Sequence, residues 1–256
     1  MRNLARLIGR SLWLGAELSL LALRFLFLYV RRGGRWTMQD RAIGLQAGSR
    51  RILRVVASRV ELNGPLPRSG LLVSNHLSYV DILLLGSLAP AVFVSKAEVK
   101  GWPIFGWFAA LGGTVFVQRE RRGHVGEVSG RIRSLLAEKH LVILFPEGTS
   151  SDGREILRFK SALLEPAVGQ KCPLSVAWVS YGLSGGSVET DVCYWGDMTF
   201  APHFFKLLAK PRVTARASFA EIQSPAADRK ELAKQLHAAA VQLKDSSARS
   251  SGAVTA

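Results

Sequence analysis

The sequence predicts an α/β fold, with a mixed and partly parallel sheet flanked by helices and preceded by an amphipathic helical hairpin. Two observations support this prediction. Beyond residue 60, short apolar runs of strand length alternate with segments of helical periodicity, as in chains whose strands are connected by helices. Before residue 60, arginines recur between long apolar stretches at helical spacing.

Positive charge is concentrated in the first part of the chain. The protein has 256 residues and a net charge of +15. Residues 1–59 contain twelve arginines, no lysine and two acids, a net charge of +10, which leaves +5 for the rest. So localised a basic segment indicates a polyanionic partner, either nucleic acid or an anionic lipid surface.

The apolar stretch Leu12–Val30 distinguishes between these partners. Its length would allow a membrane span, and that alternative stays open. On a helical wheel, however, its charged residues and those flanking it fall within about 80° of one another. A charged stripe beside a broad apolar face predicts a helix in the membrane interface whose arginines face lipid phosphates. A duplex-binding protein would not need this apolar face, and we expect no nucleic-acid partner. The stripe consists of Arg2, Arg6, Arg10, Glu17, Arg24 and Arg31.

A second amphipathic, arginine-rich segment runs from Trp36 to Arg59, after the turn sequence RRGG at 31–34. The two segments predict a basic helical hairpin that docks on a membrane. We therefore divide the chain into a membrane-docking segment at 1–59, a catalytic domain at 60–243 and a tail at 244–256. The tail is rich in Ser, Ala and Gly, and we expect it to be disordered.

The elements of the second part can be read in order. Turn residues at 64–70 precede the first of them. Functional loops are expected where strands end and helices begin. We expect strands at 71–75, 91–95, 113–119, 141–145, 174–182, 189–195 and 212–220, and helices at 78–88, 102–112, 124–139 and 227–243.

The cysteines carry no metal or disulfide signal. Cys172 and Cys193 are far apart, with no CxxC and no histidine cluster near them. A structural disulfide or a zinc site is not expected, and a reducing compartment is the default.

His76 and Asp81 lie five positions apart, between a predicted strand and a predicted helix. The spacing alone is common by chance, and Asn75 or Ser78 could simply cap the helix. In this position, however, the carboxylate can reach back to one imidazole nitrogen and fix the tautomer. The other nitrogen is then free to take a proton.

Two further stretches place polar residues after predicted strands. The sequence LVILFPEGTSSDG at 141–153 puts Glu147 in a turn directly after a core strand. Arg119 ends the strand at 113–119, where a guanidinium suits bidentate phosphate recognition. A solvated loop of ordinary turn residues would explain either stretch equally well by itself.

The sequence GLSGG at 182–186 matches the pattern of a serine-hydrolase nucleophile around Ser184. Such a nucleophile needs a strand before it and a helix after it. Because we expect a strand at 189–195, a hairpin turn explains this match better. A serine esterase and a non-catalytic basic membrane protein remain the alternatives from other classes.

Taken together and in order, these motifs resemble those of the glycerolipid acyltransferase family, in particular the 1-acyl-sn-glycerol-3-phosphate acyltransferases. The pattern N-H-x-S-x-x-D is matched from Asn75 to Asp81. The pattern G-x-x-F-x-x-R is matched at Gly113, Phe116 and Arg119, and F-P-E-G-T-x-S at 145–151. A proline-opened apolar strand follows at Pro173. The motifs cover about residues 70–182, and the helical pair before them also resembles the membrane-docking element of bacterial members.

The resemblance implies a glycerolipid acyltransferase-like domain and a role for each matched residue. His76 would be the base, oriented by Asp81, in acyl transfer from acyl-CoA or acyl carrier protein to a lysolipid hydroxyl. No metal or other cofactor is implied. Partners would be an anionic membrane, the lysolipid and the acyl donor, with the protein peripheral or monotopic on the cytoplasmic face of the inner membrane. The substrate-binding residues would be Phe116, Arg119, Glu147, Gly148, Thr149, Lys160 and Pro173.

One position departs from the family pattern. Many lysophosphatidic acid acyltransferases have arginine after the threonine of the third motif, where this chain has Ser150. That arginine is associated with the acceptor phosphate. The sequences EGTSSDG and YWGDMTFAPHF also resemble the branch that acylates lyso-ornithine lipid. We expect 1-acyl-sn-glycerol-3-phosphate as acceptor, giving phosphatidic acid in phospholipid biosynthesis, with lyso-ornithine lipid as the alternative.

Overall fold

The computed structural model describes residues 2–102, 105–118 and 122–252. Its centre is a seven-stranded sheet in the order β1-β7-β6-β2-β5-β3-β4. The pairs are parallel except for β6 and β7, which run antiparallel. The mixed, partly parallel sheet predicted from the sequence is therefore confirmed. The strands are β1 (Arg59–Asn63), β2 (Gly70–Ser74), β3 (Ala91–Lys96), β4 (Val115–Val117), β5 (Leu141–Leu144), β6 (Leu174–Leu183) and β7 (Val213–Glu221).

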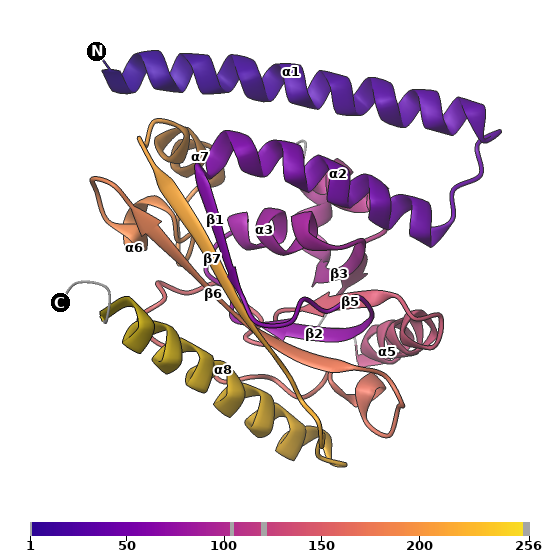
Figure 1. Ribbon diagram of the computed structural model, residues 1–256. Helices are drawn as coiled ribbons and strands as arrows, with labels where there is room; N and C mark the ends of the chain where they lie inside the picture. The colour runs from indigo at the N-terminus through magenta and orange to yellow at the C-terminus, as the bar shows by residue number, and fades with distance from the viewer. Residues whose placement is uncertain (1, 103–104, 119–121, 253–256) are drawn as a thin grey trace.

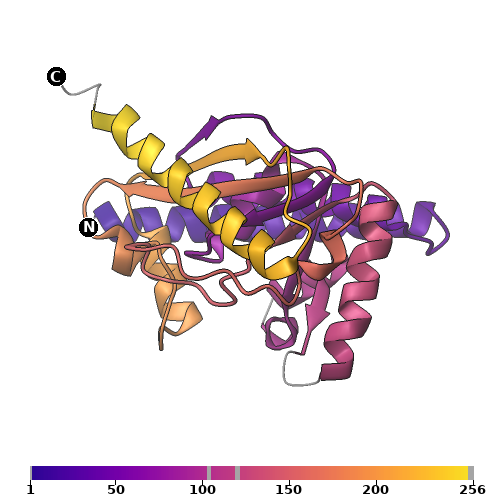
Figure 2. The same cartoon turned by 90° about the horizontal axis from the view of Figure 1, so that it is seen from below.

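Helices cover both faces of the sheet (Figures 1 and 2). One face carries α1, α2, α3 and α7, and the other carries α5 and α8. The central strand β2 is buried at all five residues, which explains its continuous apolar sequence. The helices are α1 (Arg2–Arg31), α2 (Met38–Val56), α3 (Val80–Leu88), α4 (Phe105–Leu111), α5 (Arg122–Ala137), α6 (Val188–Asp191), α7 (Phe200–Leu208) and α8 (Arg229–Gly252), with short 3₁₀ turns at Ala97–Gly101 and Glu165–Ala167.

The helical hairpin forms as predicted, and its second helix belongs to the core of the domain. A capping box between Thr37 and Asp40 begins α2. Eight residues of α2 are buried, and α2 packs along α3. Gly86 of α3 allows this close packing, because a Cβ atom there would lie 2.8 Å from Ser49 Oγ of α2. The boundary predicted at residue 59 therefore does not separate two structural units.

Arg6, Arg10 and Glu17 of the charged stripe of α1 face the protein, which corrects the orientation expected from the sequence for these residues. The rest of the stripe is exposed, at Arg2, Arg24 and Arg31. Arg6 and Arg10 donate to backbone carbonyls at the end of α7, among them Ala209 O at 2.9 Å and Lys210 O at 2.7 Å. Cations are favoured there because the last carbonyls of a helix have no helical partner. Glu17 pairs with Arg51 of α2 at 2.5 Å.

The surface of α1 that faces away from the protein is apolar instead. Leu12, Leu23 and Val30 are all more than 60% exposed. Helix α1 lies along the domain over α2 and α7 (Figure 1), and Leu7, Leu14, Leu18 and Leu21 pack against the core. By length and composition, α1 is also a helix that could cross a membrane.

Two other expectations are wrong. The predicted strand at 189–195 is the short helix α6 followed by a loop, because the Asp191 carboxylate accepts the Ser187 N–H and closes a helical turn. The tail predicted to be disordered continues α8 as far as Gly252. Lys244 donates to Arg154 O, and the hydroxyl of Ser247 bonds that of Ser218. Residues 253–256 lie outside the described ranges.

Asp191 connects α6 to α7 through two lysines and gives a stability that depends on pH. Its side chain is 4% exposed and contacts Lys206 Nζ at 2.6 Å and also Lys210 Nζ. Burial alone would raise the pKa of Asp191, but the hydrogen bonds from Lys206 and Lys210 lower it to about 2. The folded pKa is thus below the unfolded one, so the stabilisation is complete above about pH 4 and is lost as the pH falls toward 2.

We expect Asp191→Asn to lower the free energy of unfolding at pH 7 by about 1–2 kcal/mol, less than the pKa shift implies because Lys206 is half exposed. Urea unfolding of both proteins at pH 7 and pH 3 measures this, and the difference should shrink at pH 3. Glu231→Gln, which removes an exposed pair with Lys234, is the control and should change little. An Asp191→Asn penalty that is equal at both pH values would contradict the assignment.

Candidate active site

The candidate site lies where β2 and β5 end. These neighbouring strands are parallel, so the loops that follow them meet at one edge of the sheet. The loop after β2 carries His76, and the loop after β5 carries Glu147, Gly148 and Thr149. A hydrogen bond from Ser151 N to His76 O, 3.0 Å long, joins the two loops.

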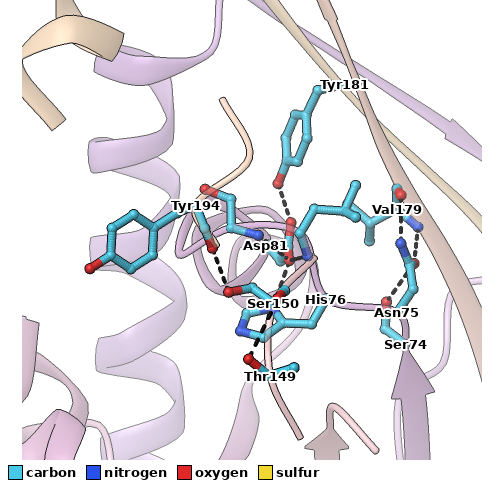
Figure 3. Close-up of polar contacts among 11 residues, drawn as sticks. Ser74, Asn75, His76, Asp81, Thr149, Ser150, Val179, Tyr181 and Tyr194 are labelled. Carbon is cyan, nitrogen blue, oxygen red and sulfur yellow. Dashed lines mark hydrogen bonds and ion pairs between the residues drawn. The ribbon is translucent and has the colours of Figure 1, made fainter. Parts of the chain in front are cut away.

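Asn75 extends the pairing of β2 with β6 beyond the end of the strand. Its side-chain amide donates to Val179 O at 3.0 Å, and its side-chain oxygen accepts from Val179 N at 2.7 Å (Figure 3). Both backbone polar groups of Val179 are thereby satisfied by one side chain. The main chain is free to leave the sheet at this point and to bend into the loop that carries His76.

The Asp81 carboxylate holds the imidazole of His76. One oxygen, Oδ2, lies 2.7 Å from His76 Nδ1 and also accepts the backbone N–H groups of Leu77 and Ser78 at 2.7 and 2.9 Å. The other oxygen, Oδ1, accepts the hydroxyl of Tyr181 from β6 (Figure 3). Because a carboxylate only accepts, the proton of the neutral imidazole lies on Nδ1, and Nε2 carries the free lone pair.

The ring of His76 is fixed on one face by an aromatic contact. It stacks on Phe145, with centroids 4.1 Å apart and planes inclined by 21°. Its side chain is 21% exposed and lines a cavity of about 350 Å³. Imidazole Nε2 bonds to none of the residues that the structure describes. The geometry therefore presents a neutral base to whatever occupies the cavity.

The cavity wall is mainly apolar, with a smaller polar share. Aromatic and aliphatic residues of α3, α4 and β3 contribute to the apolar part. Thr149, Ser150 and Lys96 are polar residues on the same wall. An elongated apolar molecule with one polar end fits such a wall.

The turn after β5 is held by backbone hydrogen bonds. Gly148 has a φ of +77°, which favours glycine. Its N–H donates to Phe145 O at 3.1 Å. The hydroxyl of Ser150 donates to the carbonyl of Tyr194. This bond attaches the loop after α6 to the turn and closes one side of the cavity.

Glu147 lies beneath the turn and is not among the described residues that form the cavity wall. It is 2% exposed, and neither carboxyl oxygen has a hydrogen bond of good geometry within the described ranges. Burial raises the pKa of Glu147 to about 8, and the negative charge of Asp81 contributes to this increase. The nearby backbone amides of His76 and Leu157 partly oppose it. The group is thus mainly neutral at pH 7 and supports the turn from within.

The other predicted site residues are distributed over the fold. Phe116 is half-buried on β4 and outside the cavity wall. Lys160 is exposed, and its backbone N–H bonds Pro146 O. Pro173 precedes β6, and because β6 is parallel to β2 it lies at the opposite edge of the sheet, where its carbonyl accepts Leu71 N–H. Pro173 is not among the residues of the cavity wall, and its predicted role in substrate binding stays a prediction. Arg119 lies outside the described residues.

Two tyrosines were missed by sequence reasoning. Tyr181 is 100 positions from Asp81, and nothing in its strand sequence distinguishes it from other buried aromatics. Tyr79 lines the cavity, and its hydroxyl bonds His203 Nδ1 at 2.9 Å. His203 Nε2 lies 2.9 Å from Cys193 O and donates to it, so Nδ1 accepts from Tyr79. The pair connects α3 to α7 behind the cavity.

Neither of the alternative chemistries finds support in the described residues. Ser184 is exposed after β6 and is not on the cavity wall that His76 lines. In ranges 2–102, 105–118 and 122–252, no three His, Cys, Asp or Glu side chains gather as metal ligands would. The chemistry that the site can perform is removal of a proton by His76 next to an apolar cavity.

Comparisons with known proteins identify the family of the chain. A family model described as Acyltransferase matches residues 58–180. The chain is 32% identical over 236 residues to a lyso-ornithine lipid O-acyltransferase of Brucella abortus, covering 86% of each chain. It is 37% identical to a protein of the same description from Rhizobium meliloti, with 64% of this chain and 61% of that one covered.

Two further similarities concern proteins of another description. A 1-acyl-sn-glycerol-3-phosphate acyltransferase of Neisseria meningitidis is 30% identical, with 73% of each chain covered. The crystal structure of a 1-acyl-sn-glycerophosphate acyltransferase, PlsC, from Thermotoga maritima shares the fold, with a TM-score of 0.60 at 20% identity over 95% of this chain and 98% of that one. On its sequence similarity to these relatives and on its mixed sheet, the chain belongs to the acyltransferase family.

Proposed function

We propose that this protein is an O-acyltransferase that moves a fatty acyl group from a thioester donor, acyl-CoA or acyl carrier protein, to a hydroxyl group of a lysolipid. The observation that carries the proposal is the His76–Asp81 pair, which presents a free imidazole nitrogen to an apolar cavity. The relatives named above are acyltransferases whose names specify lysolipid acceptors.

In the reaction, His76 Nε2 takes the proton of the acceptor hydroxyl while its oxygen attacks the thioester carbonyl carbon. The new C–O bond forms, the tetrahedral intermediate collapses, and the C–S bond breaks. The leaving thiolate receives the proton from the imidazolium, which Asp81 stabilises in the meantime. Transfer is direct, without a covalent acyl-enzyme, and we propose that no cofactor takes part.

Two apolar cavities are available for the chains of donor and acceptor. A second cavity of about 370 Å³ lies between α1, α4 and α7 and is almost wholly apolar. Phe105 and Phe108 of α4 line both this cavity and the one that contains His76. We propose that the two spaces hold acyl chains and that these phenylalanines form the partition between them.

We propose lyso-ornithine lipid as the acceptor, with 1-acyl-sn-glycerol-3-phosphate as the second candidate. Ser150 occupies the position of the phosphate-associated arginine, and its hydroxyl is engaged with Tyr194. Lyso-ornithine lipid carries a carboxylate and an ammonium group instead of a phosphate. Relatives named for that lipid also match at 37% and 32% identity, compared with 30% for the Neisseria relative.

We propose further that the outward apolar face of α1 docks in the membrane interface, on the cytoplasmic side of the inner membrane. The packing of α1 along its length favours a helix that lies on the membrane over one that crosses it. This orientation brings the cavities next to the phase that contains lysolipid and product.

Replacing His76 by Ala should lower turnover by about 10²–10⁴-fold, since the base is lost, and Asp81→Asn should leave a reduced rate. Purified proteins are assayed for acyl transfer, with thermal unfolding as a check on folding. His140→Gln, a histidine remote from the cavity, is the matched control. Near-normal turnover by a folded His76→Ala protein would refute the mechanism.

Replacing Tyr181 by Phe removes one hydroxyl and leaves Asp81 Oδ1 buried without its donor. The carboxylate then holds the imidazole of His76 less firmly, so we expect a kcat reduced about tenfold with KM unchanged. Tyr29→Phe, at an exposed tyrosine of α1, is the control. A fall in stability with an unchanged kcat would reduce Tyr181 to a structural role.

The choice of acceptor is tested by adding the missing charge. Ser150→Arg should raise the rate with 1-acyl-sn-glycerol-3-phosphate relative to lyso-ornithine lipid about tenfold, because a guanidinium pairs with phosphate. Ser150→Ala breaks the bond to Tyr194 without adding charge and should not change that ratio. The acceptor assignment fails if the unchanged protein already prefers 1-acyl-sn-glycerol-3-phosphate.

A further inference from the structure

A groove between α1 and α2, near the hairpin turn, has no part in the site described above. It encloses about 220 Å³ and shares no lining residue with the cavity that contains His76. Its wall combines two arginines, one acid and a tryptophan with an apolar floor. The floor is formed by Leu21, Phe25, Leu28, Ile43, Gly44 and Ala47.

Arg24 is the residue of the charged stripe of α1 that lines the groove. Arg6 and Arg10 bind the end of α7, and Glu17 binds Arg51. Arg24 is exposed and, like Arg2 and Arg31 of the stripe, pairs with nothing in the described parts of the chain. An unpaired arginine on the wall of an apolar groove can bind an anion from outside the protein.

The charge around the groove remains positive after its internal pairs are counted. Asp40 is the acid on the wall, and it is already engaged by Arg32 and by the N–H and hydroxyl of Thr37. Arg31 and Arg35 are exposed in the adjoining turn. A negatively charged group that enters the groove would therefore meet an excess of guanidinium groups.

Trp36 contributes a polar group without a partner. Its ring stacks on Phe25, with centroids 5.0 Å apart and planes inclined by 19°. The indole N–H is shielded from solvent and has no acceptor among the residues described. Indole nitrogen can only donate, and a buried donor without an acceptor is unfavourable. A small movement of the ring would let an oxygen atom in the groove accept this hydrogen bond.

The apolar floor continues toward the outward face of α1. Leu20, Leu23 and Phe27 are more than half exposed on the same helix. Gly44 brings the two helices together, because a Cβ atom there would lie 2.9 Å from the ring of Phe25. A ligand with a charged head and long apolar chains can thus place its head by Arg24 and its chains along α1.

We propose that this groove binds the phosphodiester headgroup of an anionic membrane phospholipid, with Arg24 on the phosphate and Arg32 and Trp36 beside it. The bound lipid is a structural ligand of the helical hairpin, separate from both substrates. The proposal rests on the docking of α1 in the membrane and adds to it a defined lipid site. A free acyl chain has no phosphate to bind Arg24, and a soluble anion has no apolar chain to contact the floor of the groove.

The test measures retained lipid by native mass spectrometry of the full-length protein in detergent, titrated with phosphatidylglycerol or phosphatidylcholine. We expect preferential retention of phosphatidylglycerol, weakened about tenfold by Arg24→Gln, since one guanidinium–phosphate contact is lost. Trp36→Phe should weaken it by a smaller factor. Arg229→Gln, which removes one charge at the start of α8 on the opposite face (Figure 1), should leave it unchanged.

Two further measurements distinguish the lipid site from the proposed acyl transfer and from the proposed docking of α1 in the membrane. Turnover of the Arg24→Gln protein with detergent-dispersed substrates should remain normal, because Arg24 lies outside the catalytic cavity. The double variant Leu23→Gln and Leu26→Gln should not bind phosphatidylglycerol vesicles. If the wild-type protein does not bind these vesicles either, the docking of α1 in the membrane is refuted. If vesicles are bound but both lipids are retained equally, or if inorganic phosphate displaces the lipid, the groove is not a phospholipid site.

Discussion

The Asp81 carboxylate is the interaction on which the arrangement of the site depends. It is fully buried and receives four hydrogen bonds, from His76, Leu77, Ser78 and Tyr181. A buried charge is tolerated only when it is well supplied with donors. Three of these donors come from the loop after β2, and the fourth comes from β6. The loop, the start of α3 and the central sheet must therefore all be in place before the imidazole has a defined tautomer and direction.

The same rule explains the orientation of α1. Three of its charged groups find partners on the protein side, at the open carbonyls of α7 and at Arg51. With those charges engaged inward, the opposite side of the helix is left to leucine, valine and phenylalanine. An apolar outer face is favourable only against another apolar phase. Arg24 lines the groove proposed as a lipid site, and this groove shares no lining residue with the cavity that contains His76. The proposed membrane attachment and the proposed catalysis therefore use separate parts of the molecule.

Sequence reasoning performed best where the determining contacts are local. The strands β2, β3, β5 and β6 lie close to their predicted positions, because each is a short buried run bounded by turn residues. It failed at residues 189–195, where the sequence ETDVCYW suggested a strand and the Asp191 side chain closed a helical turn instead. It also failed at the tail, where Lys244 and Ser247 find partners on other segments. Composition alone does not contain such contacts.

The sequence by itself determined the mixed α/β architecture, the basic hairpin and the candidate base, since His76 and Asp81 are five residues apart and meet through local geometry. The tertiary structure decided which other residues belong to the site. It brought Tyr181 to Asp81 and Tyr194 to Ser150, and it placed Pro173 at the far edge of the sheet. It also turned Arg6 and Arg10 of α1 toward the end of α7. These outcomes depend on strand order and helix packing, which join residues far apart in the chain and leave no periodic signal in it.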